Sequence, residues 1–338
     1  MLLNVTRRSL FTGALAFGVS ALALTNGASA QSRTLQLSHH LAPGHLVDVA
    51  SQRFAELVAE GTGGEITVEV FPSGQLAGLR QAAEAVQVGT IDVVWTDFGT
   101  LANFRPEYGF VSLPFLFQDN EHVEAVFGGT VGDELRQSVR DNLGIEILGY
   151  GNAGFRVIAT KDRSVTTPAD LEGARIRVPE VPIFVSSFAA IGANPTPMAW
   201  GEVYTALQTG VIDAVENPAE GLFVGGMHEV TTNISRTHHI MTDVNLAISA
   251  VVLDSLTPEQ QEAIRSAGET ATAEFNAATA EASEDFWSQL AGSLEVVEEP
   301  DREAFREAMA PVWEEFAAAT GEAGQGWIDK VVAAGGGQ

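Results

Sequence analysis

The sequence contains no cysteine, which excludes disulfides, thiolate metal sites and cysteine catalysis. Lysine is nearly absent as well: Lys161 and Lys330 are the only two, so a Schiff-base or P-loop mechanism has few candidates. Basic residues are scarce overall, with 18 Lys and Arg against 44 Asp and Glu and a net charge of −26. Nucleic acids and anionic membrane surfaces would repel such a chain, so we expect neither as a partner.

Sequence motifs for catalysis and metal binding are also missing. The chain has no G-x-S-x-G elbow, no H-E-x-x-H and no phosphate loop with a Gly-Lys pair. Histidines occur as the neighbours His39-His40 and His238-His239, but adjacent strand residues point to opposite faces and cannot chelate one ion together. We therefore expect no metal, no cofactor and no enzymatic activity. A secreted hydrolase or lyase is the alternative from a different class.

Residues 1–30 have the pattern of a cleaved signal peptide. Arg7 and Arg8 precede an apolar run from Gly13 to Leu24, and Ala28-Ser29-Ala30 matches a signal peptidase site. The run is shorter than the roughly 20 residues that a membrane span needs. We predict export to the periplasm with cleavage after Ala30. The paired arginines leave both the Sec and the twin-arginine routes open.

What remains is long enough for two domains and rich enough in apolar residues, at 45 % of the chain, to bury a core. Alternating apolar residues predict strands at 34–39 and 65–71, with a helix between them that ends at the glycines of 61–64. Further helix and strand pairs predict an α/β fold with largely parallel sheets. Thr257 and Pro258 begin a helical pattern that continues to about Leu290, long enough to brace two lobes.

Two segments of the chain repeat each other. Ala85–Val94 and Ala206–Val215 agree at six of ten positions, and each predicts a helix, a glycine cap and a buried strand. Chance recurrence of this common junction is the alternative. If each lobe has one copy, the residues just beyond the two strands lie at the carboxyl ends of their sheets, where open α/β sheets bind ligands. A cleft between two such edges is then expected.

Arginines near these predicted edges are candidate anion-binding residues. Alternation in the strand before Pro179 places Arg175 and Arg177 on one face, with Arg177 nearest the carboxyl end. An arginine there can present a planar fork to a carboxylate, although a surface ion pair is the alternative. Arg156 follows the glycine-rich run 149–155, which suits a hinge, a close approach of backbone to ligand, or an ordinary loop.

Five stretches carry a family resemblance: Leu171–Pro179, Gly192–Asp213, Glu216–Pro218, Phe71–Leu76 and Leu113–Phe117. Together they resemble the extracytoplasmic solute-binding proteins of tripartite ATP-independent periplasmic (TRAP) transporters, the DctP family. The resemblance implies that Arg177 binds a ligand carboxylate and that Arg156 and Asn217 assist it. It also implies an organic acid ligand and, as partners, the small and large TRAP membrane subunits.

The same resemblance implies a two-lobed periplasmic binding protein fold, with the ligand cleft between the lobes and a long bracing helix. We expect residues 31–153 and 244–282 to form lobe 1, and residues 154–243 and 283–338 to form lobe 2. The chain is expected to act as a monomer and without catalysis.

Trp95 and Asp97 follow the first-lobe copy of the repeated segment and are candidate specificity residues. Packing in the core is the alternative for Trp95. An aspartate in the cleft would accept hydrogen bonds from hydroxyl groups but repel a second carboxylate. The sequence therefore favours a sugar acid, such as a uronate or an aldonate, as the ligand. A C4-dicarboxylate or a keto acid is the alternative.

Overall fold

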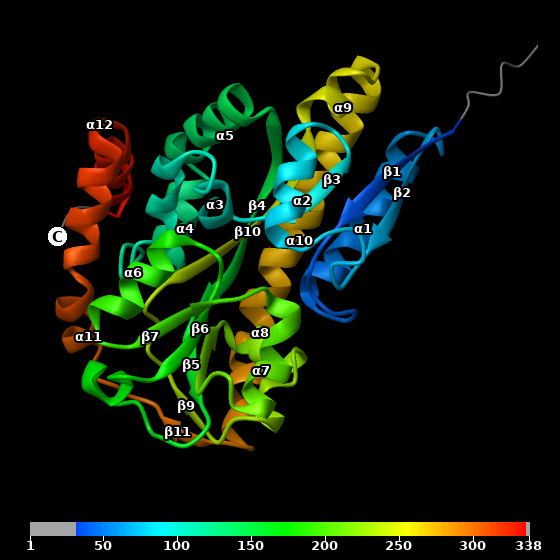
Figure 1. The fold of residues 1–338 in the computed structure, drawn as a ribbon. Coiled ribbons are helices and arrows are strands. Elements are labelled where there is room, and N and C mark those ends of the chain that lie inside the picture. The colour runs from blue at the N-terminus through cyan, green and yellow to red at the C-terminus, as the bar shows by residue number, and fades with distance from the viewer. Residues whose placement is uncertain (1–31, 336–338) are drawn as a thin grey trace, which may run out of the picture. The chain divides into compact units, whose positions relative to one another are not determined.

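The structure, a computed structural model, describes residues 32–335, in which two mixed β-sheets are packed among helices (Figure 1). The predicted signal peptide and its cleavage site lie outside these residues. In the part of the chain that is described, no helix is both long and apolar enough to cross a membrane.

The first sheet has five strands in the order β2-β1-β3-β10-β4. Their bounds are β1 Arg33–Ser38, β2 Ile66–Phe71, β3 Val93–Thr96, β4 Ile145–Phe155 and β10 Met241–Ser249. Strands β2, β1 and β3 are parallel, whereas β10 runs antiparallel to both β3 and β4.

The second sheet has six strands in the order β11-β9-β5-β8-β6-β7. Their bounds are β5 Val157–Thr160, β6 Arg175–Val178, β7 Asn194–Pro197, β8 Ala214–Asn217, β9 Asn233–Ser235 and β11 Glu295–Val297. Strand β6 is parallel to β7 and β8, and β5 is antiparallel to β8 and β9.

The prediction of an α/β fold is confirmed, but the sheets are mixed rather than largely parallel. Antiparallel strands occur where the chain passes from one sheet to the other. It leaves the first sheet at the end of β4, passes through Arg156 and enters the second sheet as β5, and it returns between β9 and β10. A strand that arrives from the other sheet enters from the opposite side, so β5 and β10 run against their neighbours.

Helices precede and follow these strands in both halves. The α-helices are α1 Leu46–Gly61, α2 Leu79–Gln87, α3 Phe98–Leu101, α4 Asn120–Phe127, α5 Thr130–Leu143, α6 Pro182–Ala190, α7 Val203–Thr209, α8 Ala219–Val224, α9 Ala250–Asp254, α10 Pro258–Ala291, α11 Arg302–Met309 and α12 Pro311–Ala334. Short 3-10 turns are η1 Pro106–Ser112, η2 Pro168–Leu171, η3 Trp200–Glu202 and η4 Met227–Glu229.

Each sheet is buried on both faces, as strands in α/β proteins usually are. In β3, Val94 belongs to one hydrophobic cluster of the first sheet and Val93 to the other. In the second sheet, Ile158 and Val157 of β5 divide between two further clusters in the same way.

Helix α10 is the long bracing helix that the sequence predicts. Thr257 caps it through its hydroxyl oxygen and Gln260 reaches back to the backbone of Thr257, so the predicted start is confirmed. The helix contacts α1 and β4 on the side of the first sheet and α8 on the side of the second (Figure 1). It therefore spans both halves of the cleft.

The repeated segment is confirmed as a structural repeat. In the first copy α2 leads through Gly89, at φ 72°, into β3, and in the second copy α7 leads through Gly210, at φ 75°, into β8. Each sheet contains one copy, so the residues after β3 and β8 occupy equivalent positions.

The glycine-rich run 149–155 is the C-terminal part of β4 and is not a loop. A Cβ on Gly149 would lie 2.0 Å from the hydroxyl oxygen of Thr272 in α10, and a Cβ on Gly151 would lie 2.2 Å from the carbonyl oxygen of Val244 in β10. These two glycines thus allow close packing between β4, α10 and β10.

The final helix returns to the first-sheet side of the molecule. Val312, Phe316 and Ile328 of α12 belong to the same hydrophobic cluster as Val94 of β3, and α12 contacts η1 and α4. The sequence-based division instead put all of 283–338 in lobe 2. We propose that lobe 1 includes α12, while the other lobe boundaries stay predictions.

Candidate ligand-binding site

A cavity with charged and apolar lining residues lies where the strand ends of the two sheets approach each other, and four of the five predicted site residues line it. Its volume is about 90 Å³, several times the roughly 10–15 Å³ that one water molecule needs. The residues lining it are His40, Leu41, His45, Leu79, Asp97, Ser112, Ala153, Arg156, Arg177, Pro179, Val181, Phe184, Trp200, Asn217, Pro218, Glu220, Gly221, Met241, Thr242, Asp243 and Val244. Arg156, Arg177, Asn217 and Asp97 are thus brought together, and their role in binding stays a prediction.

Arg177 is held rigidly at the carboxyl end of β6. Its Nε and Nη2 donate to the carbonyl oxygen of Met198 at 2.9 and 2.8 Å, and its guanidinium lies 5.3 Å from the ring centroid of Trp200. Arg175 and Arg177 share one face of β6, but Arg175 at the start of the strand is exposed, whereas Arg177 near its carboxyl end is only 5 % exposed. The remaining nitrogen, Nη1, donates to no protein acceptor within residues 32–335.

The charge of Arg177 has no carboxylate partner. Among the ion pairs of residues 32–335, none includes Arg177. Burial lowers its pKa from the usual value to about 10, although the carboxylate of Glu216 farther away acts in the opposite direction. The guanidinium therefore stays protonated at neutral pH. A buried charge without a counter-ion raises the free energy of the folded protein, so binding one anion beside Arg177 is favourable.

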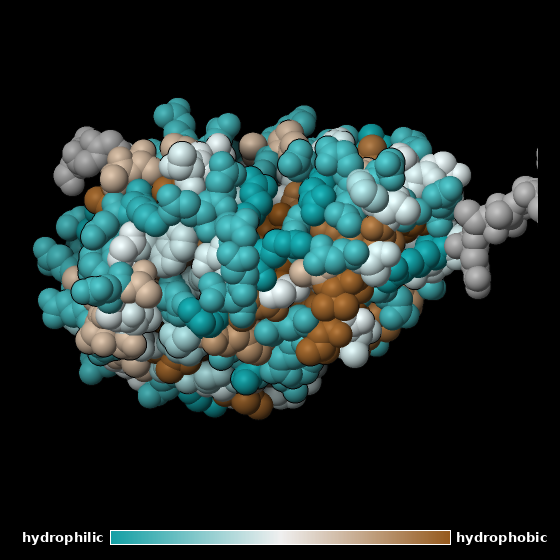
Figure 2. Space-filling model, turned by 90° about the horizontal axis from the view of Figure 1, so that it is seen from above, coloured by the Kyte–Doolittle hydropathy of each residue, from teal (hydrophilic) through white to brown (hydrophobic). Residues whose placement is uncertain are grey.

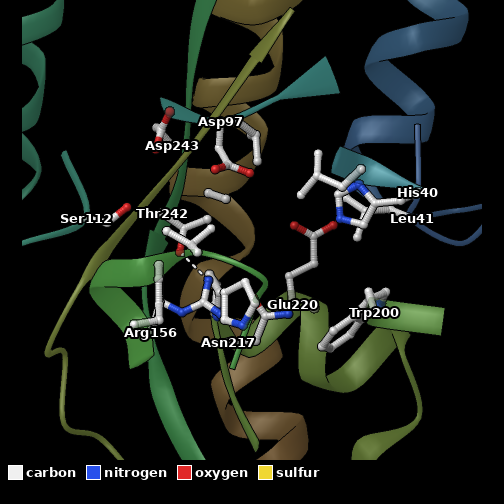
Figure 3. Close-up of a pocket in the computed structure, with 18 of the residues that line it drawn as sticks. His40, Leu41, Asp97, Ser112, Arg156, Trp200, Asn217, Glu220, Thr242 and Asp243 are labelled. Atoms are coloured by element: carbon white, nitrogen blue, oxygen red, sulfur yellow. Dashed lines mark hydrogen bonds between the residues drawn. The ribbon is translucent and has the colours of Figure 1, made fainter. Parts of the chain in front are cut away.

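Arg156, by contrast, is fully engaged by the protein. Its Nε and Nη2 pair with the carboxylate of Glu216, Nη2 also reaches the Glu216 carbonyl oxygen at 2.9 Å, and Nη1 donates to the Thr242 hydroxyl at 2.9 Å (Figure 3). Burial acts to raise the pKa of Glu216, but Arg156 and then His239, at 3.4 Å, outweigh it, so this pKa is lowered. The pair fixes Arg156 at the cavity wall.

Asn217 ends β8 next to Arg156 and is half-buried (Figure 3). Its side-chain amide makes no hydrogen bond to any described part of the protein, and it lines the cavity. The amide thus has both a donor and an acceptor available for a ligand.

The opposite side of the cavity carries two carboxyl groups, Asp97 and Asp243 (Figure 3). Asp97 caps α3 by accepting from the Thr100 backbone at 2.6 Å and its hydroxyl at 3.1 Å. Asp243 is 3 % exposed and accepts from the Phe98 backbone at 2.8 Å. Burial and then the neighbouring Asp97 raise the pKa of Asp243 to about 8, and burial also raises the pKa of Asp97. At neutral pH the pair therefore retains a proton.

Trp95 does not line the cavity, so its selection as a specificity residue is corrected. It is 2 % exposed, its Nε1 donates to the Ser51 hydroxyl at 2.8 Å, and its ring lies 5.6 Å from that of Phe275 in α10. The side chain fills the core between β3, α1 and α10. The alternative interpretation, core packing, is the one that the structure supports.

Sequence analysis missed two acidic residues of the cavity, Asp243 and Glu220. A weak signal for Asp243 was present, because it alternates with Met241 in a strand that continues into the apolar residues Leu246, Ala247 and Ile248. Glu220 lies three residues after Asn217, on the short helix α8. Nothing in its local pattern distinguishes it from a solvated surface glutamate.

Two sheets with cores of their own, joined by chain crossings and enclosing a cavity at their strand ends, define the two-lobed fold of periplasmic binding proteins. The chain belongs to the DctP family: the family model described as bacterial extracellular solute-binding protein, family 7, matches residues 37–320. The resemblance in the sequence is thereby confirmed.

Characterised relatives bind organic acids. The chain is 32 % identical to the 2,3-diketo-L-gulonate-binding periplasmic protein of Escherichia coli over 79 % of both chains. A TRAP periplasmic solute-binding protein of Sulfitobacter, solved with β-D-galacturonate, is 32 % identical, with a TM-score of 0.85 and coverage of 88 % of this chain and 99 % of that one. A TRAP protein of Sulfurospirillum deleyianum, solved with succinate, is 27 % identical, with a TM-score of 0.84 and coverage of 90 % and 99 %.

Proposed function

We propose that this protein captures a sugar acid, a uronate or an aldonate, outside the cytoplasmic membrane and delivers it to the small and large subunits of a TRAP transporter. The observation that carries the proposal is the arrangement of charge in the cavity. A buried arginine without a carboxylate partner lies on the second-sheet side, and an acidic pair lies on the first-sheet side.

The carboxylate of the ligand binds Arg177. That guanidinium is held by Met198 and Trp200 but lacks an anion, and a bidentate contact with a carboxylate supplies one. Asn217 adds neutral hydrogen-bonding groups beside it. Arg156 is already paired with Glu216, so its guanidinium has no free pair of N–H groups for a ligand carboxylate. It contributes positive potential and helps to shape the cavity.

The hydroxyl groups of the ligand bind Asp97 and Asp243. A carboxyl pair that keeps one proton can both accept and donate hydrogen bonds, which matches hydroxyl groups. A second carboxylate placed there would meet negative charge. The pair therefore selects a polyhydroxylated monoacid over a dicarboxylate.

Relatives support this ligand class, since two of those described above bind hexose-derived acids. The succinate-bound relative keeps a C4-dicarboxylate as the second candidate. A keto acid is a further alternative of the same kind.

The cellular role follows from the family and the leader sequence. Residues 1–30 direct export and are removed after Ala30, and the mature protein works in the periplasm as a monomer. Binding and release complete its task, so no catalytic step is assigned. Incubating the protein with candidate acids and finding turnover would favour a hydrolase or lyase instead.

Uronates and aldonates are expected to stabilise the purified mature protein against heat. A ligand held only by the folded state at 100 times its Kd adds about 2.7 kcal/mol to the free energy of unfolding. The midpoint Tm should therefore rise by several degrees in a thermal-shift assay. A panel of sugar acids, dicarboxylates, keto acids and amino acids that all leave Tm unchanged would contradict the proposed function.

The variant Asp97→Ala is expected to weaken a uronate by about tenfold or more, because a hydrogen bond to a charged group is lost. Succinate should bind equally well or better, since a repelling group is removed. Asp97→Asn retains the cap on Thr100 and controls for local unfolding of α3. Calorimetric titration with each ligand measures the ratio of the two affinities. An equal loss of affinity for both would show that Asp97 does not set specificity.

A further inference from the structure

Glu220 joins the two sides of the cleft. It extends from α8, beyond the second sheet, toward the segment of His40 and Leu41 (Figure 3). Its Oε1 accepts from the backbone N–H of Leu46 at 2.6 Å, in the first turn of α1, which packs on the first sheet. The residue is 6 % exposed. A carboxyl group from one side of the cleft thus caps a helix of the other side.

A second hydrogen bond across the cleft offers a comparison. The side-chain amide of Asn103, which follows α3, donates to the carbonyl oxygen of Glu180, after β6, at 3.2 Å. This contact is exposed and neutral. Glu220 differs because its link is buried and depends on a group that can ionise.

The second carboxyl oxygen of Glu220, Oε2, is buried and has no hydrogen-bond partner among residues 32–335. An ionised carboxylate in this place would leave one charged oxygen without a donor, which is costly. Protonation of Oε2 removes that charge while Oε1 continues to accept from Leu46. In agreement, burial raises the pKa of Glu220 to about 7, and the Leu46 hydrogen bond lowers it only partly.

The neighbouring titratable groups do not donate a hydrogen bond to the carboxyl group of Glu220. His45, the residue before α1, has its Nδ1 3.4 Å from Oε1, but that nitrogen accepts from the Val47 backbone. Burial first, and then His39, lower the pKa of His45 to about 3, so it is neutral.

Glu220 also borders a second cavity, whose charged or titratable lining groups are Arg236, His238 and Glu284. Arg236 is paired with Glu284 at 2.8 Å. Burial and then Arg302 lower the pKa of His238 to about 4, so it too is neutral. On the ligand side, burial and then His45 lower the pKa of His40 to about 3, so it is neutral, and the charged groups are those of the site already described.

We propose that Glu220 is the latch that holds the cleft closed, and that closure over the ligand places a proton on its Oε2. The proposal rests on the proposed function, since the ligand is what the cleft closes over. Glu220 is a positioning residue: it acts on affinity through closure, by linking α8 to the first turn of α1.

The direction of the pH effect follows from proton linkage. In the open cleft water reaches the carboxyl group, and its pKa returns to the usual 4.5, below the value of about 7 in the closed form. The closed form therefore binds more protons, and its advantage is complete below pH 4.5 and lost as the pH rises through 7. Ligand affinity should be about tenfold weaker at pH 8 than at pH 6 from this group alone.

Calorimetric titration of the mature protein with D-galacturonate between pH 5 and pH 8 tests the latch. Glu220→Gln keeps an acceptor for Leu46 but cannot ionise. Its affinity should be independent of this titration and, from the two pKa values of about 7 and 4.5, about 300-fold tighter than that of the wild type at pH 8. Glu220→Ala removes the link itself and should bind more weakly at every pH. Asp97 and Asp243 are present in all these proteins, so differences between the pH profiles report Glu220.

Glu124→Gln, at an exposed position of α4, and Asn103→Ala, at the neutral contact, should keep the wild-type pH profile. The same pH dependence in Glu220→Gln as in the wild type would overturn the latch. If D-galacturonate fails, the titration uses whichever acid of the thermal-shift panel binds. Binding by no acid would refute the proposed function, and the latch with it.

Discussion

Replacing Arg177 by alanine is expected to lower the affinity for the acid ligand by about 100- to 3,000-fold. The substitution leaves a carboxylate in a closed, desolvated cleft without its partner, a loss of about 3–5 kcal/mol by analogy with broken buried ion pairs. The protein should remain folded, because Arg177 forms no ion pair within the described residues. Calorimetric titration, with circular dichroism to confirm folding, measures the change.

Two further variants separate the geometry of Arg177 from its charge and position. Arg177→Lys should recover only part of the affinity, because an ammonium group keeps the charge but lacks the planar fork. Arg175→Ala is the matched control: Arg175 lies two residues earlier on the same strand, pairs with Asp213 at its surface and should cost little. Loss of binding in Arg175→Ala but not in Arg177→Ala would overturn the assignment.

Local patterns placed two residues of the second-sheet side at strand ends, while their role in binding was implied by the family resemblance and stays a prediction. Alternation in β6 and the stop at Pro179 placed Arg177 at a carboxyl end, and the repeated helix-glycine-strand segment placed Asn217 at an equivalent edge of its own strand. Both inferences depend on neighbours in sequence. The cap at Thr257 likewise identified the start of α10 from adjacent residues.

The first-sheet side depends on contacts between distant segments, which local patterns do not contain. Asp97 meets Asp243 only because β10 returns antiparallel beside β3, a crossing that the expected parallel sheets did not include. Trp95 belongs to the core because α1 and α10 cover that face of β3. Glu220 of α8 contacts the first turn of α1 only because the fold brings these two distant segments together across the cleft.

Positive and negative groups lie on different sides of the cavity. Arg177 and Arg156 come from the second-sheet side and from the crossing, while Asp97 and Asp243 come from the first sheet. In the proposed binding mode, each side alone contacts only one end of a sugar acid. A ligand with a carboxylate at one end and hydroxyl groups at the other is held fully only between them. Hydrophilic residues cover most of the face seen in Figure 2, with smaller hydrophobic areas among them.

The largest expected effect on folding comes from Glu216. Replacing it by alanine leaves the guanidinium of Arg156 buried, at 5 % exposure, without its carboxylate. Removing one partner of a buried ion pair lowers the free energy of unfolding by about 3–5 kcal/mol. Urea denaturation of the mature protein without ligand measures this loss. The matched control is Glu274→Ala, which breaks the exposed pair with Arg53 at 3.0 Å and should cost little, because water and salt screen an exposed pair.

Acid unfolding gives an independent test of the same pair. The pKa of Glu216 is lowered in the folded protein, with burial opposed and outweighed by Arg156 and His239, so the unfolded chain binds a proton more readily. Its stabilising contribution is therefore present above the ordinary pKa of 4.5 and lost as the pH falls through the folded value. Glu216→Ala should lose less stability than the wild type on acidification below pH 4.5, although it is less stable at pH 7. Equal acid sensitivity in both proteins, or an equal loss at pH 7 in the Glu274→Ala control, would show that this pair does not stabilise the crossing between the sheets.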